Sequence, residues 1–186
     1  MKRIFDLLLG IVILVLLVIP ILVISIAVRI SSKGSVLYWS RRIGRNNEIF
    51  NMPKFRTMLI TTPEIATHLL NTPNSYLSPI GTFLRRFSLD EFPQLFSVVK
   101  GDMSFIGPRP ALHNQDDLIA LRTQQGVDKL LPGITGWAQV NGRDELSISD
   151  KVAFDVEYLN HQSFWFDMKI LRMTLLKVLN RDGVSH

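Results

Sequence analysis

Two adjacent carboxylates, Asp90 and Glu91, are the residues whose types and spacing best suit chemistry. They lie in "SLDEFPQLF", residues 88–96. A carboxylate can attack phosphorus and form an acyl phosphate. It can also hold Mg²⁺, which screens the repulsion between a carboxylate and a diphosphate. The pair therefore suits phosphate chemistry, with Mg²⁺ held by one of the two carboxylates.

The same residues also match a helix cap. Ser88 and Glu91 have the spacing of a capping box, but Pro93 would then fall inside the helix, where its N–H is needed. If Asp90 is the cap, Pro93 falls in the first turn and is tolerated. A helix start beside the acids would also favour a phosphate. The local pattern thus leaves a cap and a catalytic site as alternatives.

Basic residues in rigid sequence contexts favour the catalytic alternative. Arg109 lies between two prolines, and Arg143 follows the pair Asn141-Gly142, which is typical of a tight turn. A well-positioned arginine suits a bidentate phosphate or carboxylate partner. The cations expected to converge on the acids are Lys54, Arg56, Arg85, Arg86, Arg109 and Arg143.

The N-terminal stretch Leu7–Val28 contains no charged residue. Its roughly 22 residues would form a helix of about 33 Å, long enough to cross a bilayer. A signal peptide fits less well, because the run is long and no small-residue cleavage site follows it. Membrane association is therefore expected.

Pro20 and the flanking charges decide between a spanning and a re-entrant helix. Pro20 removes a helix hydrogen bond and favours a kink. Both flanks of the apolar run are basic, so the positive-inside rule places both on the cytoplasmic side. A helix that enters the membrane, bends at Pro20 and returns satisfies both features. Ser25 could bond to a backbone carbonyl in its second arm. We predict a re-entrant anchor, residues 1–33, and a cytoplasmic-face catalytic domain, residues 34–186.

The catalytic domain is predicted to be α+β and helix-rich. Residues 36–39 resemble a short strand, residues 41–45 a basic turn, and residues 50–58 an extended segment. Helices are expected over 63–70 and 80–87, with the rest of 60–80 a lid-like loop. Asn141-Gly142 predicts a short hairpin.

Two helices are expected to close the chain. Ser149 is the predicted N-cap of the first, which ends near His161, and Ser163 that of the second. The second helix either packs in the core or rests on the bilayer as an amphipathic interfacial helix. Its expected apolar face consists of Phe164, Met168, Leu171, Leu175 and Val178.

Composition excludes several classes of site. The chain of 186 residues has no cysteine, so disulfides and cysteine metal sites are excluded, and its four histidines lack ligand spacing for zinc. The net charge of +5 suits an anionic membrane surface or phosphate-bearing substrates. No nucleic-acid motif is recognisable, so a non-catalytic basic adaptor and a nucleic-acid partner are not expected.

Three motifs resemble the bacterial sugar transferases, the small monotopic phosphoglycosyl transferases. They are "KFRTM" at 54–58, "LRRFSLDEFPQLFSVVKGDMSFIGPRP" at 84–110 and "LPGITGWAQVNGR" at 131–143. "FDVEYL" at 154–159 and "FDMKIL" at 166–171 agree as well. With the apolar N-terminus, the resemblance covers nearly the whole chain, and the long middle motif is highly specific.

The resemblance implies a polyprenol phosphate phosphoglycosyl-1-phosphate transferase. Such enzymes move a sugar-1-phosphate from a UDP-sugar to a polyprenol phosphate such as undecaprenyl phosphate and release UMP. It implies Asp90 as the nucleophile and Mg²⁺ ligand, and Glu91 as a residue that orients the site or assists proton transfer. The expected phosphate-binding residues are Lys54, Arg56, Arg85, Arg109 and Arg143.

The resemblance also implies a setting. The family uses a re-entrant helix broken at proline, which matches Pro20, on the cytoplasmic face of the bacterial inner membrane. Expected partners are the UDP-sugar, polyprenol phosphate, membrane lipid and downstream glycosyltransferases of polysaccharide or glycoconjugate assembly. The chain resembles the minimal catalytic unit, without the N-terminal region of the large bifunctional members.

The sequence departs from the family pattern at three places. Ile19 stands where many members have Ser before the membrane proline, and Ser97 where members commonly have Asn. Residues 61–79 match no family pattern and are expected to influence the choice of sugar, which the sequence does not name. The alternative activity is a Mg²⁺-dependent membrane-bound phosphohydrolase of lipid-linked phosphates, with water as the acceptor.

Overall fold

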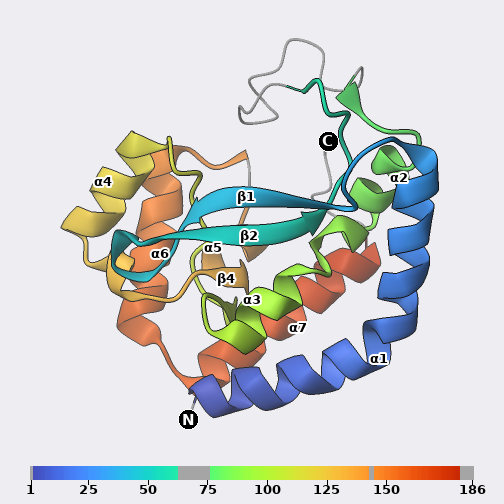
Figure 1. The fold of residues 1–186 in the computed structure, drawn as a ribbon. Coiled ribbons are helices and arrows are strands. Elements are labelled where there is room, and N and C mark those ends of the chain that lie inside the picture. Colours follow the sequence, from blue (N-terminus) through green and yellow to red (C-terminus); the bar gives the residue numbers. More distant parts are fainter. Residues whose placement is uncertain (1, 63–75, 143–144, 181–186) are drawn as a thin grey trace.

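The structure is a computed structural model that describes residues 2–62, 76–142 and 145–180, with the backbone alone for 178–180. It confirms a mixed, helix-rich fold (Figure 1). The helices are α1 (Lys2–Ser31), α2 (Gly81–Arg86), α3 (Gln94–Lys100), α4 (Asp116–Gln124), α5 (Trp137–Val140), α6 (Ile148–His161) and α7 (Phe164–Asn180). The strands are β1 (Leu37–Ile43), β2 (Ile49–Phe55), β3 (Ser104–Ile106) and β4 (Gly133–Thr135), with 3₁₀ turns η1 (Arg45–Asn47), η4 (Leu89–Glu91) and η5 (Val127–Lys129).

The apolar helix α1 is long enough to cross a membrane, with a mean hydropathy of 3.5 in its most apolar window. It is one helix with Pro20 inside it, so the predicted break at Pro20 is not confirmed. Figure 1 nevertheless shows α1 running along the lower edge of the molecule and then turning up its right side. Ser25 donates a hydrogen bond to the Ile21 carbonyl at 2.7 Å, as expected for the second arm.

Both ends of α1 pack on the same folded body. Gly10 lies against α3, where an added Cβ would come within 3.1 Å of Val99, so a glycine allows the close approach. At the other end, the fully buried Val28 packs with Phe55 and Leu84. The middle of the helix exposes large apolar side chains, including Val15, Leu16, Ile19, Leu22 and Val23.

Polar side chains anchor the first turns of α1. Lys2 forms an ion pair with Asp167 of α7, and Arg3 donates to two carbonyls in the last turn of α3. The buried Asp6 accepts a hydrogen bond from the backbone N–H of Phe105 at 3.3 Å. The start of the apolar helix is therefore held against α3, β3 and α7.

The hairpin of the fold is β1–β2, which pairs antiparallel from Leu37↔Phe55 to Ile43↔Ile49. Its turn is η1, where Asn46 and Asn47 adopt left-handed φ values of 55° and 61°, a region that asparagine tolerates. The basic turn predicted for residues 41–45 is thus shifted, because 41–43 belong to β1.

The hairpin predicted at Asn141-Gly142 is wrong. The preceding residues form the helical turn α5, and the Asn141 side chain donates to the Trp137 carbonyl at 2.7 Å. The strand before it, β4, pairs in parallel with β3. The Asn141-Gly142 pair does not join two strands here, because β4 pairs with β3, which lies earlier in the chain.

The core lies beneath the hairpin and between α3, α6 and α7. In Figure 1, α4 and α6 lie beside one end of the hairpin, and α2 and part of α1 beside the other. The central buried side chains come from six elements and the loop before β3, and they include Met52, Val98, Met103, Ile106, Val140, Tyr158 and Ile170.

The two C-terminal helices are confirmed with changed details. Ser147, not Ser149, caps α6 by accepting from the N–H of Asp150 at 3.1 Å. Ser163 caps α7 as predicted, accepting from the N–H of Phe166 at 3.2 Å. The expected helix over 80–87 corresponds to α2, whereas the expected helix over 63–70 lies outside the described residues.

The predicted apolar face of α7 is turned to the core only in part, through Leu171, and the side chain of Val178 lies outside the described residues. Phe164 and Leu175 are exposed, at 56% and 64%, and the inward face carries Phe166, Asp167 and Ile170. Placement of polar Asp167 inward follows from its ion pair with Lys2 at the start of α1. The helix therefore combines a core-packing face with exposed apolar side chains.

Candidate active site

Asp90 and Glu91 lie in η4, a single 3₁₀ turn between α2 and α3. The capping-box interpretation is wrong: Ser88 has a left-handed φ of 52° and makes no side-chain cap, and α3 starts only at Gln94, after Pro93. Pro93 thus precedes the helix, where its missing N–H is harmless. The turn leaves both carboxylates available for contacts outside the helix start.

Asp90 is the buried member of the pair, with 8% of its surface exposed. Burial raises the pKa of Asp90, and the neighbouring carboxylate of Glu91 raises it further. The charges of Lys54 and Arg85 act in the opposite direction and lower this pKa. Asp90 is therefore a weakly solvated carboxylate whose ionised form depends on nearby cations.

Glu91, the second acid of the pair, contacts two of the predicted cations. Lys54 of β2 lies 2.9 Å from Oε1 of Glu91, and a guanidinium nitrogen of Arg109 lies 3.8 Å from the same oxygen. All three side chains are partly shielded from solvent. The fold thus brings together charged residues that the sequence places far apart.

Arg85 is positioned by a residue that the sequence interpretation passed over, Thr57. The Nε of Arg85 donates a hydrogen bond to the Thr57 hydroxyl at 3.0 Å. Gly81 brings α2 against this segment, because a Cβ there would lie 2.1 Å from the Thr57 carbonyl oxygen. Burial lowers the pKa of Arg85, while the charge of Asp90 raises it. Arg85 therefore belongs to the electrostatic surroundings of Asp90.

The loop of Arg109 is held by backbone hydrogen bonds just before the arginine and by a side chain just after it. The N–H of Gly107 donates to the carbonyl of Thr135, and the N–H of Gly133 donates to that of Pro108, each at 2.9 Å. Arg42 of β1 adds a bond to the Pro110 carbonyl at 3.1 Å. The two prolines flanking Arg109 restrict the backbone further.

A buried ion pair, Arg122–Asp155, supports the same loop. Arg122 donates to Oδ2 of Asp155 at 2.6 and 2.9 Å and to the backbone carbonyl of Arg109 at 2.8 Å. Asp155 is 1% exposed, and burial raises its pKa, with Arg122 acting against the shift. Sequence interpretation missed this pair, although an acid three residues from each of two core positions, Val152 and Tyr158, marks a buried carboxylate on α6.

Two predicted site residues are not brought to the acids within the described structure. Arg56 is 7% exposed and donates to the carbonyl and hydroxyl of Ser32, at 3.0 and 2.9 Å, which ties the end of β2 to the segment after α1. Arg143 lies outside the described residues. Phosphate binding by these two residues stays a prediction.

The two carboxylates at this site are too few for a metal site built from protein ligands alone, but they suit Mg²⁺. The described residues contain no group of three or more His, Asp or Glu side chains that could hold an ion. Mg²⁺ is commonly held by one or two carboxylates together with substrate phosphates and water. Asp90 and Glu91 offer such a set.

Comparison with known proteins identifies the family. The family model described as "Bacterial sugar transferase" matches residues 1–181. The chain belongs to the bacterial sugar transferase family. The match includes α1, the Asp90-Glu91 turn and the loop of Arg109, so the apolar helix and the charged site both lie within the matched region.

Individual relatives are similar over almost the whole sugar transferase chain. It is 37% identical over 184 residues to the "UDP-glucose:undecaprenyl-phosphate glucose-1-phosphate transferase" of Escherichia coli (strain K12), covering 95% of this chain and 40% of that protein. It is 35% identical over 201 residues to the "Undecaprenyl-phosphate galactose phosphotransferase" of Salmonella typhimurium, covering 98% of this chain and 41% of the relative. An uncharacterised sugar transferase of Bacillus subtilis is 38% identical, covering 100% of this chain and 90% of the relative.

The chain therefore spans about two fifths of the length of several named relatives and nearly all of another. The region common to them contains the charged site described above.

Proposed function

We propose that this sugar transferase moves a sugar-1-phosphate from a UDP-sugar to undecaprenyl phosphate and releases UMP. The observation that carries the proposal is the buried Asp90 beside Glu91 with Lys54, Arg85 and Arg109 around the pair. Relatives named as undecaprenyl-phosphate sugar transferases support the substrate classes.

The reaction is proposed to proceed in two displacements at phosphorus. A carboxylate oxygen of Asp90 attacks the phosphorus that bears the sugar, the bond to the bridging oxygen breaks, and UMP leaves. The phosphate oxygen of the polyprenol phosphate then attacks the same phosphorus. This step breaks the aspartyl bond, restores the carboxylate of Asp90 and forms the polyprenyl-diphospho-sugar.

The surrounding side chains have distinct proposed roles. The ion pair with Lys54 holds the Glu91 carboxylate beside Asp90, where it can accept a proton from the incoming polyprenol phosphate. Arg109 and Arg85 lie where they can balance negative charge on the transferred phosphoryl group. Burial of Asp90 leaves its oxygens poorly hydrated and therefore more nucleophilic.

Mg²⁺ is the proposed cofactor, with Asp90 as its principal protein ligand. When bound, it would neutralise charge on the diphosphate. Removing divalent ions with EDTA is expected to abolish UMP release, and added Mg²⁺ should restore it, whereas Ca²⁺ should restore little because it prefers a larger and more flexible oxygen shell. Full activity in EDTA would contradict the assignment.

The dependence of rate on pH tests the surroundings of Asp90. The nucleophile must be ionised, so kcat/KM at a fixed Mg²⁺ concentration should fall on the acid side as Asp90 becomes protonated, and charges near Asp90 should move that limb. Lys54→Met removes a charge that lowers the pKa of Asp90 and should move the acid limb to higher pH. Glu91→Gln removes a charge that raises the pKa of Asp90 and should move the acid limb of kcat/KM to lower pH. Shifts in the same direction for both variants would refute this electrostatic arrangement.

Product analysis separates transfer from hydrolysis. Incubation with a panel of UDP-sugars, with and without undecaprenyl phosphate, should yield multiple turnovers of UMP only when the polyprenol phosphate is present. A phosphohydrolase would need no such acceptor. The lipid-linked product would then be consumed by membrane glycosyltransferases that extend a glycan, which are the proposed downstream partners.

The proposed location is the cytoplasmic face of the bacterial inner membrane, with α1 entering and leaving by the same face. This topology is supported by the packing of both ends of α1 on one body and by its exposed apolar middle. A straight span would carry one basic flank, Lys2-Arg3 or Arg29, to the other side of the membrane.

Introduced cysteines test this topology, because the chain has none of its own. Single variants Lys2→Cys and Lys33→Cys in sealed inverted vesicles should both react with a membrane-impermeant maleimide. Val15→Cys, in the exposed apolar middle, should be protected until detergent is added. Labelling of only one of the two flanking positions would establish a spanning helix instead.

A further inference from the structure

A hollow of about 170 Å³ lies on the surface where the start of α1 meets the hairpin turn and η5. Three cations from these separate segments line it: Lys2, Arg45 and Lys129. The apolar part of its lining is made by Ile106, Leu130 and Leu131. The lining residues, all within the described part of the chain, include no acidic side chain.

The three cations differ in how they are held. Lys2 forms an ion pair with Asp167 and donates a hydrogen bond to the Tyr158 hydroxyl at 3.0 Å. Its charge is therefore partly balanced. Arg45 and Lys129 are exposed to solvent. Three positive charges with one adjacent carboxylate leave the hollow positive, which suits a monoanionic or dianionic ligand.

The hollow is separate from the charged site of the reaction. None of Asp90, Glu91 and Lys54 lines it. Arg3, next to Lys2, donates to carbonyls in the last turn of α3, whereas the two acids precede the first turn of that helix. The hollow therefore lies toward the opposite end of α3 from the acids.

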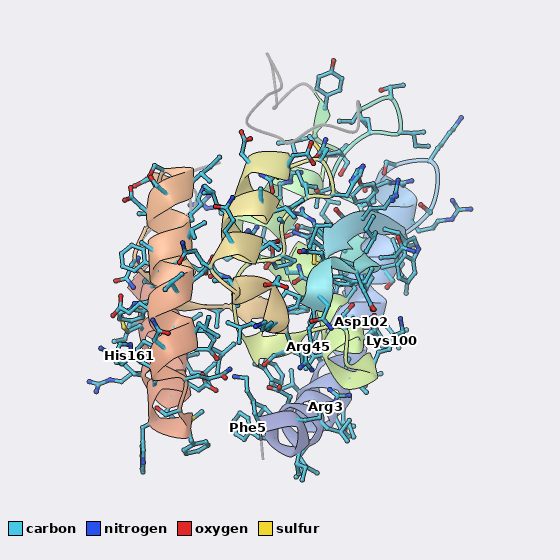
Figure 2. All side chains as sticks on the ribbon, turned by 90° about the vertical axis from the view of Figure 1, so that its left-hand side faces the viewer. Arg3, Phe5, Arg45, Lys100, Asp102 and His161 are labelled. Atoms are coloured by element: carbon cyan, nitrogen blue, oxygen red, sulfur yellow. The ribbon has the colours of Figure 1, made fainter. Side chains whose placement is uncertain are left out.

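Aromatic side chains beside the hollow place it at the membrane surface. Phe5 and Phe164 pack edge to face at 5.9 Å between ring centroids, and the next residue, Trp165, is 80% exposed. Tryptophan is enriched at the level of lipid head groups, so the exposed ring of Trp165 supports this placement. Figure 2 shows Phe5 at the start of α1, with Arg45 above it in that view.

We infer that this hollow binds the phosphate group of an anionic phospholipid. The ammonium of Lys129 and the guanidinium of Arg45 can donate to phosphate oxygens, and the amide of Gln162 in the lining adds a neutral donor. The apolar part of the lining accommodates the glycerol portion. The site would hold the start of α1 at head-group depth. The inference rests on the membrane placement proposed above and not on the reaction.

Native mass spectrometry of the full chain in mild detergent tests the site, with phosphatidylglycerol and phosphatidylcholine added in equal amounts. The wild type should retain one phosphatidylglycerol in preference to phosphatidylcholine. The double variant Arg45→Ser/Lys129→Ser should lower that retention by about tenfold or more, since each basic residue at a lipid surface contributes appreciably. Arg41→Ser/Lys33→Ser removes the same charge from exposed positions elsewhere and should retain the lipid.

Equal loss in the two double variants, or no preference for phosphatidylglycerol in the wild type, would overturn the inference. Competition identifies the source of the phosphate: millimolar inorganic phosphate should leave the retained lipid in place, and displacement would assign the hollow to a soluble phosphate instead. Displacement by UDP would show that it belongs to the nucleotide site. Because no arm depends on turnover, failure here is distinguishable from failure of the proposed reaction.

Discussion

Replacing Asp90 by asparagine is expected to lower the rate of UMP release by about 10⁴-fold or more, because the amide cannot form the aspartyl-phosphosugar. The measurement is UMP release under saturating UDP-sugar and undecaprenyl phosphate. Wild-type enzyme incubated with UDP-sugar alone and quenched should carry the phosphosugar on the peptide containing Asp90, and Asp90→Asn should carry none. Turnover of Asp90→Asn at the wild-type rate would refute the assignment.

The same substitution should leave the fold intact or strengthen it. The pKa of Asp90 is raised in the folded state, so the folded chain binds the proton more tightly than the unfolded chain. The contribution of Asp90 to the free energy of unfolding is then fully present below its unfolded-state pKa. It is lost as pH rises through its folded-state pKa. At neutral pH the ionised carboxylate therefore destabilises the protein, and the melting temperature of Asp90→Asn should equal or exceed that of the wild type. Asp102→Asn, at a surface ion pair with Lys100, is the matched control and should change neither activity nor melting temperature appreciably.

Replacing Asp155 by asparagine is expected to destabilise the protein by about 3 kcal/mol, because it leaves the largely buried guanidinium of Arg122, which donates two bonds to Asp155, without its carboxylate. This loss should outweigh the gain from burying one negative charge fewer, which the raised pKa of Asp155 reflects. Thermal unfolding of the detergent-solubilised protein measures the effect as a lower melting temperature. Turnover at a permissive temperature should fall as well, since Arg122 also holds the carbonyl of Arg109, whose guanidinium faces Glu91.

A double variant separates the stabilising role from the positioning role. Asp155→Leu/Arg122→Met removes both charges and should recover much of the lost melting temperature, as replacement of buried ion pairs by apolar groups often does. It cannot restore the bond to the Arg109 carbonyl, so kcat should remain low. Recovery of both stability and kcat would show that the ion pair is structural only.

Sequence patterns succeeded where the controlling interactions are local or where a long motif is specific. The apolar run of α1 and the N-cap of Ser163 depend on neighbouring residues only, and both were predicted. The family followed from motifs spread along the chain and was confirmed by the family comparison. The choice of Asp90 and Glu91 as the reactive pair also came from the sequence and remains a prediction for the experiments above.

Local patterns failed where a distant partner competes with them. Ser88 and Glu91 have the spacing of a capping box, but the Glu91 carboxylate pairs with Lys54, a residue of another element. Asn141-Gly142 has the preferred hairpin pair, yet β4 pairs with β3 rather than with the segment after the turn.

Residue patterns alone predict the apolar N-terminal helix, the helix-rich α+β chain and a family whose motifs include two adjacent acids. The burial of Asp90, the meeting of Lys54 and Arg109 at Glu91, and the support of the Arg109 loop by Arg122 and Asp155 are visible only in the folded chain. This division arises because propensity and periodicity act over a few residues. Burial and ion pairing depend instead on which distant segments pack together, and these contacts set the ionisation of the site.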